Sequence, residues 1–170
     1  MRISCEPLNS LHLARVVQLL QRSNQFNLRT QRFSETKCRE LMKNFDQTPA
    51  FQVKLRDKFG DYGLISVVCA QIEGTQLEIS EYVMSCRVLN RGVEQYVMTS
   101  LVNLCKAQNL SSIVGEVIPT AKNTLVSGFY QQFGFKLVEQ TESRSVWKLS
   151  VADYVEPKCY IQKESVNDER

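Results

Sequence analysis

The stretch EYVMSCRVLNRGVEQYV, residues 81–97, decides how we interpret the fold of this chain. An apolar run ends at Cys86, an Asn-Arg-Gly turn follows at residues 90–92, and a helical pattern then opens with Glu94 in its first turn. A strand that leads into such a turn is a common way to hold a phosphate group, because the free amides and the dipole of the helix N-terminus favour an anion there. The stretch therefore predicts a strand–turn–helix unit with an anion site.

Composition sets the class of protein. With 170 residues, 43% of them apolar and 23% charged, the chain is long enough for one globular domain with an ordinary core. A net charge of +3 is too weak a bias to indicate a nucleic-acid partner. No segment approaches the roughly 20 apolar residues of a membrane-spanning helix, and MRISCEPLNS lacks the apolar segment of a secretory signal. We therefore expect a cytoplasmic protein without a membrane partner.

The cysteines do not indicate a metal site. They form no C-x-x-C pair, and His12 is the only histidine, so we expect no bound metal. Three of them fall on apolar faces of predicted elements, which favours buried free thiols in a reducing compartment. Those three are Cys38, Cys69 and Cys105, and the others are Cys5, Cys86 and Cys159.

Hydrophobic spacing predicts the element order α-α-β-β-β-α-β-α-β-β. Apolar residues at helical spacing predict helices over residues 10–22, 34–44, 92–107 and 122–133. Alternation and β-branched runs predict strands over residues 51–55, 64–72, 77–88 and 111–118, with a terminal hairpin over 135–151. The almost continuous apolar run at 64–72 predicts a central strand. This order predicts one α+β domain over residues 1–150, with a mixed, mostly antiparallel sheet and helices on both faces, followed by a C-terminal tail over 151–170.

Two stretches resemble the GNAT fold of acyltransferases: NRGVEQYV at residues 90–97 and KNTLVSGFYQQFGF at residues 122–135. The resemblance implies a turn at Arg91 and Gly92 whose amides hold the pyrophosphate of coenzyme A. It places Asn123 and Tyr130 near the pantetheine and the thioester sulfur, with Tyr130 protonating the leaving thiolate. In this fold the strand before the turn splays from the next strand, and the thioester lies in the gap.

Four separated motifs are similar to the C-terminal GNAT-like domain of FkbH-like proteins. They are RSNQFNLRTQRFS, DKFGDYGLISVV, MSCRVLNRGVE and PTAKN with FYQQFGF. In that family a phosphatase-like HAD domain precedes this domain, and a glyceryl group passes from a bisphosphoglycerate to an acyl carrier protein in methoxymalonyl-type polyketide biosynthesis. The HAD motif D-x-D-x-T is absent from this chain. The resemblance therefore implies a HAD domain acting in cis or in trans and an acyl carrier protein as partner.

The turn departs from the family pattern R/Q-x-x-G-x-G/A at Leu89 and at Glu94. A small residue lets the backbone approach a pyrophosphate, whereas a carboxylate about 4 Å from an anion costs roughly 1 kcal/mol even in water. We therefore expect no tightly bound cofactor; the phosphopantetheine of a carrier protein, or coenzyme A, would be the interacting group. Its phosphate would meet Arg87, Arg91 and Gly92. Alternatively, Glu94 only interacts with the helix dipole.

Cys86 is our hypothesis for the catalytic nucleophile. A thiol at the end of the splayed strand could hold a glyceryl thioester and pass it to the thiol of the carrier protein. Arg87, Arg91 and the helix N-terminus favour a thiolate there, and Glu94 opposes it. The alternative is an inert buried cysteine.

Further polar residues could bind the substrate. Polyol recognition needs several hydrogen-bonding groups, and the loop after the first helix offers Asn24, Gln25, Asn27 and Arg32, while Thr120 and Lys122 could meet a phosphate or an acidic carrier protein. Plainer alternatives are turn hydrogen bonds for the loop, a surface charge for Lys122, a helix cap for Asn123 and a core aromatic for Tyr130. At the level of function, a non-catalytic docking module and a coenzyme A-dependent N-acetyltransferase stay open.

Overall fold

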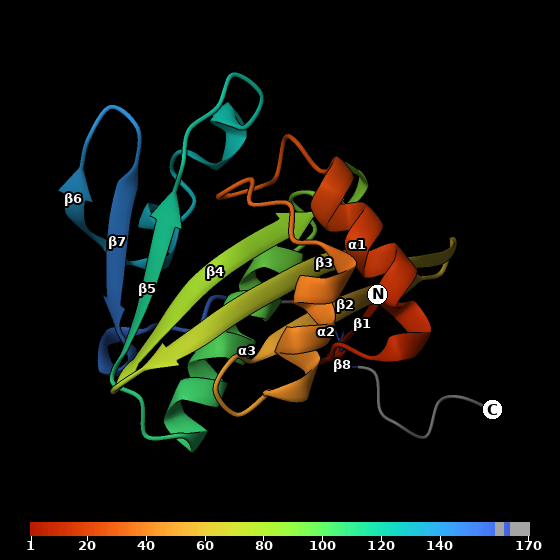
Figure 1. Ribbon diagram of the computed structural model, residues 1–170, viewed down its shortest axis with the longest axis horizontal. Helices are drawn as coiled ribbons and strands as arrows, with labels where there is room; N and C mark the ends of the chain where they lie inside the picture. The colour runs from red at the N-terminus through yellow and green to blue at the C-terminus, as the bar shows by residue number, and fades with distance from the viewer. Residues whose placement is uncertain (159–161, 164–170) are drawn as a thin grey trace.

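The computed structural model describes residues 1–158 and 162–163, so Cys159 and half of the expected tail lie outside the described residues. One sheet runs through the molecule in the order β6-β7-β5-β4-β3-β2-β1-β8 (Figure 1). All neighbouring pairs are antiparallel except β4–β5 and β1–β8. The strands are β1 (Arg2–Pro7), β2 (Ala50–Asp57), β3 (Gly60–Glu73), β4 (Gln76–Met84), β5 (Ser112–Val117), β6 (Lys136–Gln140), β7 (Ser145–Ser150) and β8 (Gln162–Lys163).

Helices cover both faces of the sheet, as predicted. Helices α1 (Leu13–Arg22) and α2 (Glu35–Lys43) lie on one face, and α3 (Val93–Ala107) lies on the other (Figure 1). Each face has its own apolar cluster, so β3 is buried from both sides over residues 64–70. The predicted central strand and the α+β class with a mixed, mostly antiparallel sheet are therefore confirmed.

Local chemistry explains how the two front helices begin. Ser34 precedes α2, and its hydroxyl accepts a hydrogen bond from the Lys37 amide at 3.1 Å. Asn9 precedes a short 3-10 turn (Ser10–His12) that leads into α1, and its side chain accepts from the His12 amide at 3.1 Å. Both residues satisfy an amide that the helix leaves unpaired, so both act as N-terminal caps.

Strands β4 and β5 pair only at their first halves. The ladder runs from Gln76 opposite Ser112 to Ile79 opposite Gly115. Beyond these residues the two strands diverge, and a wedge opens between them (Figure 1). The splayed strand that the resemblance implied is therefore present.

The first strand of the chain was not predicted, and another was predicted to be longer than it is. Strand β1 was not predicted, because only Ile3 in RISCEP is fully buried and the segment shows no clear alternation. The strand predicted over residues 77–88 ends at Met84, and Cys86–Val88 form a 3-10 turn. Between the strands predicted over 51–55 and 64–72 the chain reverses at Asp57–Gly60, where the Asp57 carboxylate accepts hydrogen bonds from the amides of Phe59 and Gly60.

The helix predicted over residues 122–133 was also wrong. The segment forms two 3-10 turns, Thr124–Val126 and Gln131–Phe133, with amides bonded three residues back. Asn, Thr, Ser and Gly at positions 123, 124, 127 and 128 are weak helix formers, and so short a helix has little stability of its own. The packing of its aromatic side chains therefore determines the backbone conformation of this segment.

The packed part of the chain continues past residue 150. Val151 is buried, and the Tyr154 hydroxyl lies 2.8 Å from the Thr99 hydroxyl on α3. The first residues assigned to the tail thus belong to the body of the domain.

Candidate active site

Residues 26–28, here called the inserted segment, fill the wedge between β4 and β5. The Leu28 amide donates to the Tyr82 carbonyl and the Met84 amide donates to the Phe26 carbonyl, both at 3.1 Å. On the other side, the Ile118 amide donates to the Leu28 carbonyl at 2.9 Å. The segment therefore takes the hydrogen-bonding edge of β4 that the splay would otherwise leave open.

Side chains lock the inserted segment in place. Phe26 packs edge-on against Tyr82 and Phe129, with ring centroids 5.1 and 5.3 Å away. Asn27 is fully buried; its amide nitrogen donates to the Ser23 carbonyl and its oxygen accepts from the Thr30 amide. Asn27 was predicted to bind substrate, but its polar side-chain atoms form hydrogen bonds within its own loop.

Glu81 on β4 anchors the residues that follow the segment. This fully buried carboxylate accepts hydrogen bonds from the backbone amides of Gln31, Tyr82 and Arg29 at 2.7, 3.0 and 3.3 Å. Burial raises the pKa of Glu81, although the three amides act in the opposite direction. The Arg29 guanidinium also bonds the Ser80 carbonyl and Glu116 across the wedge.

Asn123 closes the wedge from its far side. Its amide nitrogen donates to the carbonyl oxygens of Asn27 and Ile118, both at 2.9 Å, and its oxygen accepts from the Thr120 amide at 2.7 Å. The Thr120 hydroxyl accepts from the amides of Lys122 and Asn123. An amide side chain with both donors and its acceptor engaged has little left for pantetheine. The Lys122 side chain is exposed.

Tyr130 lies inside the core. Only 1% of its surface is exposed, and its hydroxyl has no hydrogen-bond partner among the described residues. Its ring lies over Gly115, where a β-carbon would sit 2.0 Å from the ring. Burial raises the pKa of Tyr130 well above its usual value, so the phenol stays protonated in the core.

Glu94 turns back into the loop before α3. Its Oε1 atom accepts from the Asn90 amide at 3.1 Å, and its Oε2 atom is buried without a partner among the described residues. A cavity of only about 70 Å³ remains between this turn and Phe129. Sites for organic ligands have volumes of roughly 300–1,000 Å³, so this turn offers no cavity of that size, and the Glu94 carboxylate lies where the resemblance implied a pyrophosphate.

Arg91 binds side chains on β2 and β3, whereas Arg87 binds a hydroxyl close to it in the sequence. Arg91 Nη1 donates to the Tyr62 hydroxyl at 3.1 Å and to Asp57 at 3.4 Å, with its guanidinium 5.1 Å from the Tyr62 ring centroid. Gly92 adopts φ +88° as the N-cap of α3. Arg87 is exposed, and its Nε atom donates a hydrogen bond to the Ser85 hydroxyl, beside Cys86, at 3.3 Å.

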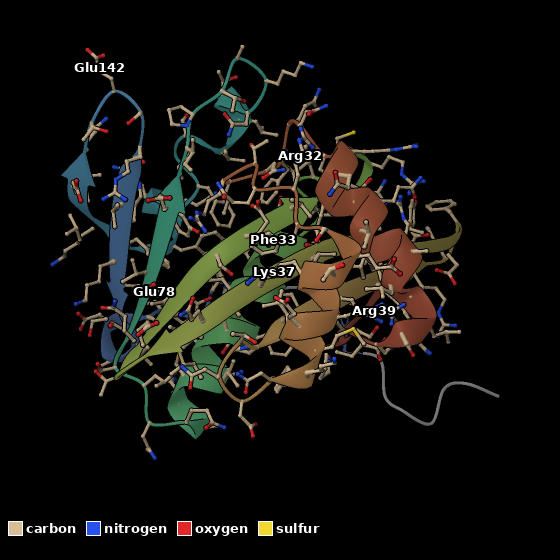
Figure 2. The ribbon with its side chains drawn as sticks, in the orientation of Figure 1. Arg32, Phe33, Lys37, Arg39, Glu78 and Glu142 are labelled. Atoms are coloured by element: carbon tan, nitrogen blue, oxygen red, sulfur yellow. The ribbon has the colours of Figure 1, made fainter. Side chains whose placement is uncertain are left out.

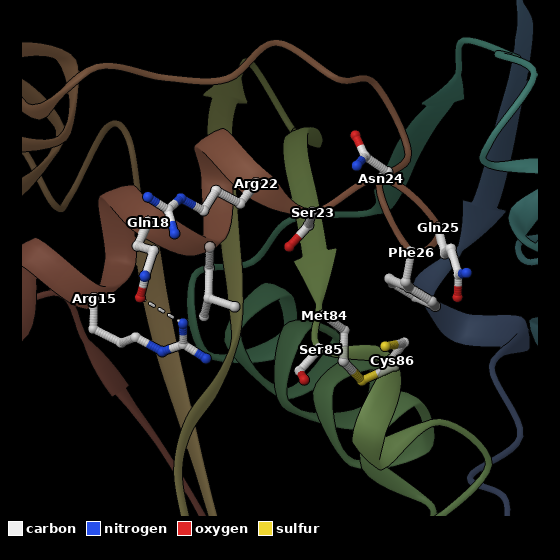
Figure 3. Close-up of a pocket in the computed structure, with 11 residues that line it drawn as sticks. Arg15, Gln18, Arg22, Ser23, Asn24, Gln25, Phe26, Met84, Ser85 and Cys86 are labelled. Atoms are coloured by element: carbon white, nitrogen blue, oxygen red, sulfur yellow. Dashed lines mark hydrogen bonds between the residues drawn. The ribbon is translucent and has the colours of Figure 1, made fainter.

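Cys86 faces a cavity of about 350 Å³ between the end of β4 and α1, here called the Cys86 cavity (Figure 3). Among the described cysteines Cys86 is exposed, whereas Cys38, Cys69 and Cys105 are buried free thiols as expected. Burial raises the pKa of Cys38 and of Cys105 to about 11. The accessible thiol and a cavity of about 350 Å³ therefore coincide at the C-terminal end of β4.

Helix α1 contributes cavity residues that the sequence reasoning missed. Arg15, Gln18 and Arg22 lie along one wall, opposite Ser85 and Cys86 (Figure 3). Arg15 Nη1 donates to the Gln18 side-chain oxygen at 2.7 Å. The i, i+3, i+7 spacing of these polar residues was the available signal, but it is also the pattern of any solvated helix face.

The predicted loop residues divide into two groups. Asn24 and Gln25 line the Cys86 cavity. Arg32 instead holds the loop, because it bonds the Asn24 side chain at 2.6 Å and the carbonyls of Gln21 and Ser23 at the C-terminal end of α1 (Figure 2). A cation at that helix end also complements the helix dipole.

The described residues contain neither a cluster of metal ligands nor a membrane-spanning helix. In residues 1–158 and 162–163 no three His, Cys, Asp or Glu side chains gather as they would around a metal ion. In the same ranges no helix combines the length and apolar character that crossing a membrane requires.

The sequence matches no protein-family model and no curated protein sequence. Solved structures do share its fold. The PaiA N-acetyltransferase of Thermoplasma acidophilum, in complex with coenzyme A, has a TM-score of 0.72 at 12% identity, covering 88% of this chain and 99% of that one. The ribosomal-protein-S18-alanine N-acetyltransferase of Escherichia coli has 0.67 at 13%, covering 88% and 94%. The spermidine N-acetyltransferase of Vibrio cholerae, with coenzyme A and spermine, has 0.63 at 14%, covering 88% and 96%. The chain therefore has the fold of the GNAT N-acetyltransferases.

Proposed function

We propose that this domain is an acyltransferase that carries a glyceryl or related short acyl group as a thioester on Cys86 and delivers it to the phosphopantetheine thiol of an acyl carrier protein. The observation that carries the proposal is the exposed Cys86 thiol, which opens onto a cavity of about 350 Å³ at the end of β4. The choice of a glyceryl group and of an acyl carrier protein as its acceptor rests on the four motifs that are similar to FkbH-like proteins.

The filled wedge supports a thiol on the protein rather than bound coenzyme A. The inserted segment uses the carbonyl of Tyr82 and the amide of Met84, and Glu94 occupies the turn before α3. A cofactor arm lying between β4 and β5 would have to displace buried side chains and break these hydrogen bonds. A domain that holds the acyl group covalently does not need that arm during loading.

The chemistry consists of two acyl exchanges. In the first, the Cys86 thiolate attacks the carbonyl carbon of an acyl phosphate; a C–S bond forms, the C–O bond breaks, and inorganic phosphate leaves with the electron pair. In the second, the carrier thiolate attacks the Cys86 thioester, and the Cys86 thiolate leaves. The second exchange is almost thermoneutral because one thioester replaces another. Removal of a further phosphate would belong to the separate HAD domain.

Intact mass spectrometry tests this proposal. Incubation with 1,3-bisphosphoglycerate should add one acyl group to the chain, and addition of a carrier protein with its phosphopantetheine should move that group to the carrier. Cys86→Ser should abolish the adduct, and Cys5→Ser should keep it. An adduct that survives Cys86→Ser would remove Cys86 from the mechanism, and carrier binding with no adduct in any variant would leave a docking module.

A coenzyme A-dependent N-acetyltransferase is the second candidate. It is favoured by the shared fold with two structures that contain coenzyme A. This function requires the inserted segment to leave the wedge. A calorimetric titration with acetyl-coenzyme A decides between the candidates: micromolar binding would favour the N-acetyltransferase, and the absence of binding would favour the Cys86 thioester.

A further inference from the structure

We propose that Arg15 and Arg22 form a phosphate subsite in the Cys86 cavity, so that the site selects short acyl groups that carry a terminal phosphate. This inference rests on the proposed function, because it concerns the donor whose carbonyl carbon reaches Cys86. Both arginines lie on the wall that α1 contributes, opposite Ser85 and Cys86 (Figure 3). A phosphate held on this wall would leave the other end of a short donor at the thiol.

Within the described residues, no carboxylate pairs with the charges of this wall. The residues that line the cavity include no Asp or Glu. Within the described part of the chain, Arg15 bonds only the Gln18 side chain, and Arg22 forms no hydrogen bond or ion pair. By contrast, Arg29, Arg91 and Arg144 each pair with a carboxylate. The two α1 arginines are therefore available to an anion from outside.

The electrostatic surroundings also favour an anion. Partial burial, together with the positive charge of nearby Arg87, holds the pKa of Arg15 below its usual value. The Arg15 and Arg87 guanidinium groups thus repel one another beside the cavity, and an anion bound at Arg15 would relieve this repulsion. Guanidinium groups bind phosphate through two parallel charge-assisted hydrogen bonds, and Ser23 and Ser85 on the cavity wall offer further donors.

The size of the cavity limits the ligand. A volume of about 350 Å³ lies near the lower end of the range for small-molecule sites. It suits a three-carbon acyl group with one phosphate and is too small for a coenzyme A molecule. We therefore assign the subsite to the small donor and not to the arm of the carrier protein.

Binding measurements on the Cys86→Ser chain test the subsite without acyl transfer. Calorimetric titration with 3-phosphoglycerate should give saturable binding, and glycerate, which lacks the phosphate, should bind about tenfold more weakly or worse. Arg15→Gln and Arg22→Gln should each weaken 3-phosphoglycerate binding by about tenfold. Arg39→Gln is the matched control, because Arg39 is an exposed arginine on α2 that pairs with Glu35, and it should change nothing.

The outcomes separate this inference from the proposed function. Equal affinity for glycerate or for malonate, undiminished binding in both arginine variants, or no binding of 3-phosphoglycerate would each overturn the subsite. If the arginine variants weaken binding but the wild-type chain never forms an adduct, the subsite stands and the Cys86 thioester falls. If the wild-type chain forms adducts equally fast with phosphorylated and unphosphorylated donors, the thioester stands and the subsite falls.

Discussion

Asn123 donates from Nδ2 to the carbonyl oxygen of Asn27 at 2.9 Å, across 96 positions of sequence. This contact joins the loop after β5 to the inserted segment beside β4. Asn123 and Asn27 are both at most 2% exposed, so water does not compete for the hydrogen bond. The wedge of the GNAT fold is therefore closed from both sides by the chain itself.

Asn123→Ala should destabilise the domain by about 1–3 kcal/mol, because two buried carbonyls and the Thr120 amide lose their partner. Urea denaturation measures this change. Lys122→Ala, at the neighbouring exposed position, should stay within about 0.5 kcal/mol of the wild type. Hydrogen exchange at the Leu28 amide should accelerate in the Asn123 variant alone; unchanged exchange would mean that Asn123 does not hold the segment.

Glu81→Ala should cost at least about 2 kcal/mol, since three backbone amides lose their acceptor. Glu78→Ala is a matched control on the same strand, because among the residues that the structure describes the Glu78 carboxylate accepts only from the Gln76 side chain, at 3.2 Å. Denaturant titration at neutral pH compares the two variants. Equal stability of both would show that the Glu81 carboxylate does not anchor the loop.

The same variant tests a pH dependence. Burial raises the pKa of Glu81 above its ordinary 4.5, so the folded chain binds this proton more tightly than the unfolded chain. Its contribution to stability is fully present below about pH 4.5 and is lost as the pH rises through the raised pKa. The unfolding free energy of the wild type should therefore decline over this interval relative to that of Glu81→Ala. Parallel pH profiles would contradict the assignment.

Tyr130→Phe should leave stability unchanged or raise it by up to about 1 kcal/mol, because the hydroxyl is buried without a partner among the described residues. Acyl transfer through Cys86 should also be unchanged. Gly115→Ala tests the packing of the same ring and should cost about 1–3 kcal/mol, since its methyl group would lie 2.0 Å from the tyrosine ring. A large loss of transfer in a stable Tyr130→Phe variant would give Tyr130 the acid role that the resemblance implied.

Alkylation at pH 8 should modify Cys86 before the other thiols in the described part of the chain. Burial raises the pKa of Cys38 and Cys105 to about 11 and that of Cys69 well above 9.0, and the thiolate is the reactive form. Mass spectrometry after iodoacetamide treatment should show a fast phase that Cys86→Ser removes. Fast labelling of a buried thiol would contradict the core packing.

These raised pKa values also predict alkaline unfolding. The stability that Cys38 and Cys105 contribute is present below pH 9, the ordinary pKa, and is lost as the pH rises toward about 11. The unfolding free energy should therefore fall over this interval. Cys105→Ala should flatten the decline.

The sequence allowed the fold to be predicted wherever a local pattern decided the structure. Ser34 caps a helix and the run at 64–70 forms a central strand because a neighbouring amide and a two-sided core are enough to fix them. Local pattern failed for residues 122–133, where aromatic packing overrides a helical spacing. It also failed for β1, whose single fully buried residue, Ile3, gives no alternation.

The candidate site was predictable only in part. Cys86 falls near the end of the strand predicted over residues 77–88, so its position close to a strand end could be inferred. Asn27 and Asn123 look like ligands in the sequence, yet they satisfy backbone groups on distant segments, and such partners cannot be read from spacing. Arg15 and Arg22 were missed because a polar helix face can be recognised as the wall of a cavity only when the position of β4 opposite it is known.

The inserted segment has a consequence for chemical probes. A compound that joins acetyl-coenzyme A to an acceptor would need the gap that the resemblance assigns to the thioester, and here the inserted segment already fills it. Such bisubstrate compounds should be poor ligands for this chain. A short electrophile with a phosphate at its far end would instead match the opening beside α1, and it would report on the sulfur without disturbing the sheet.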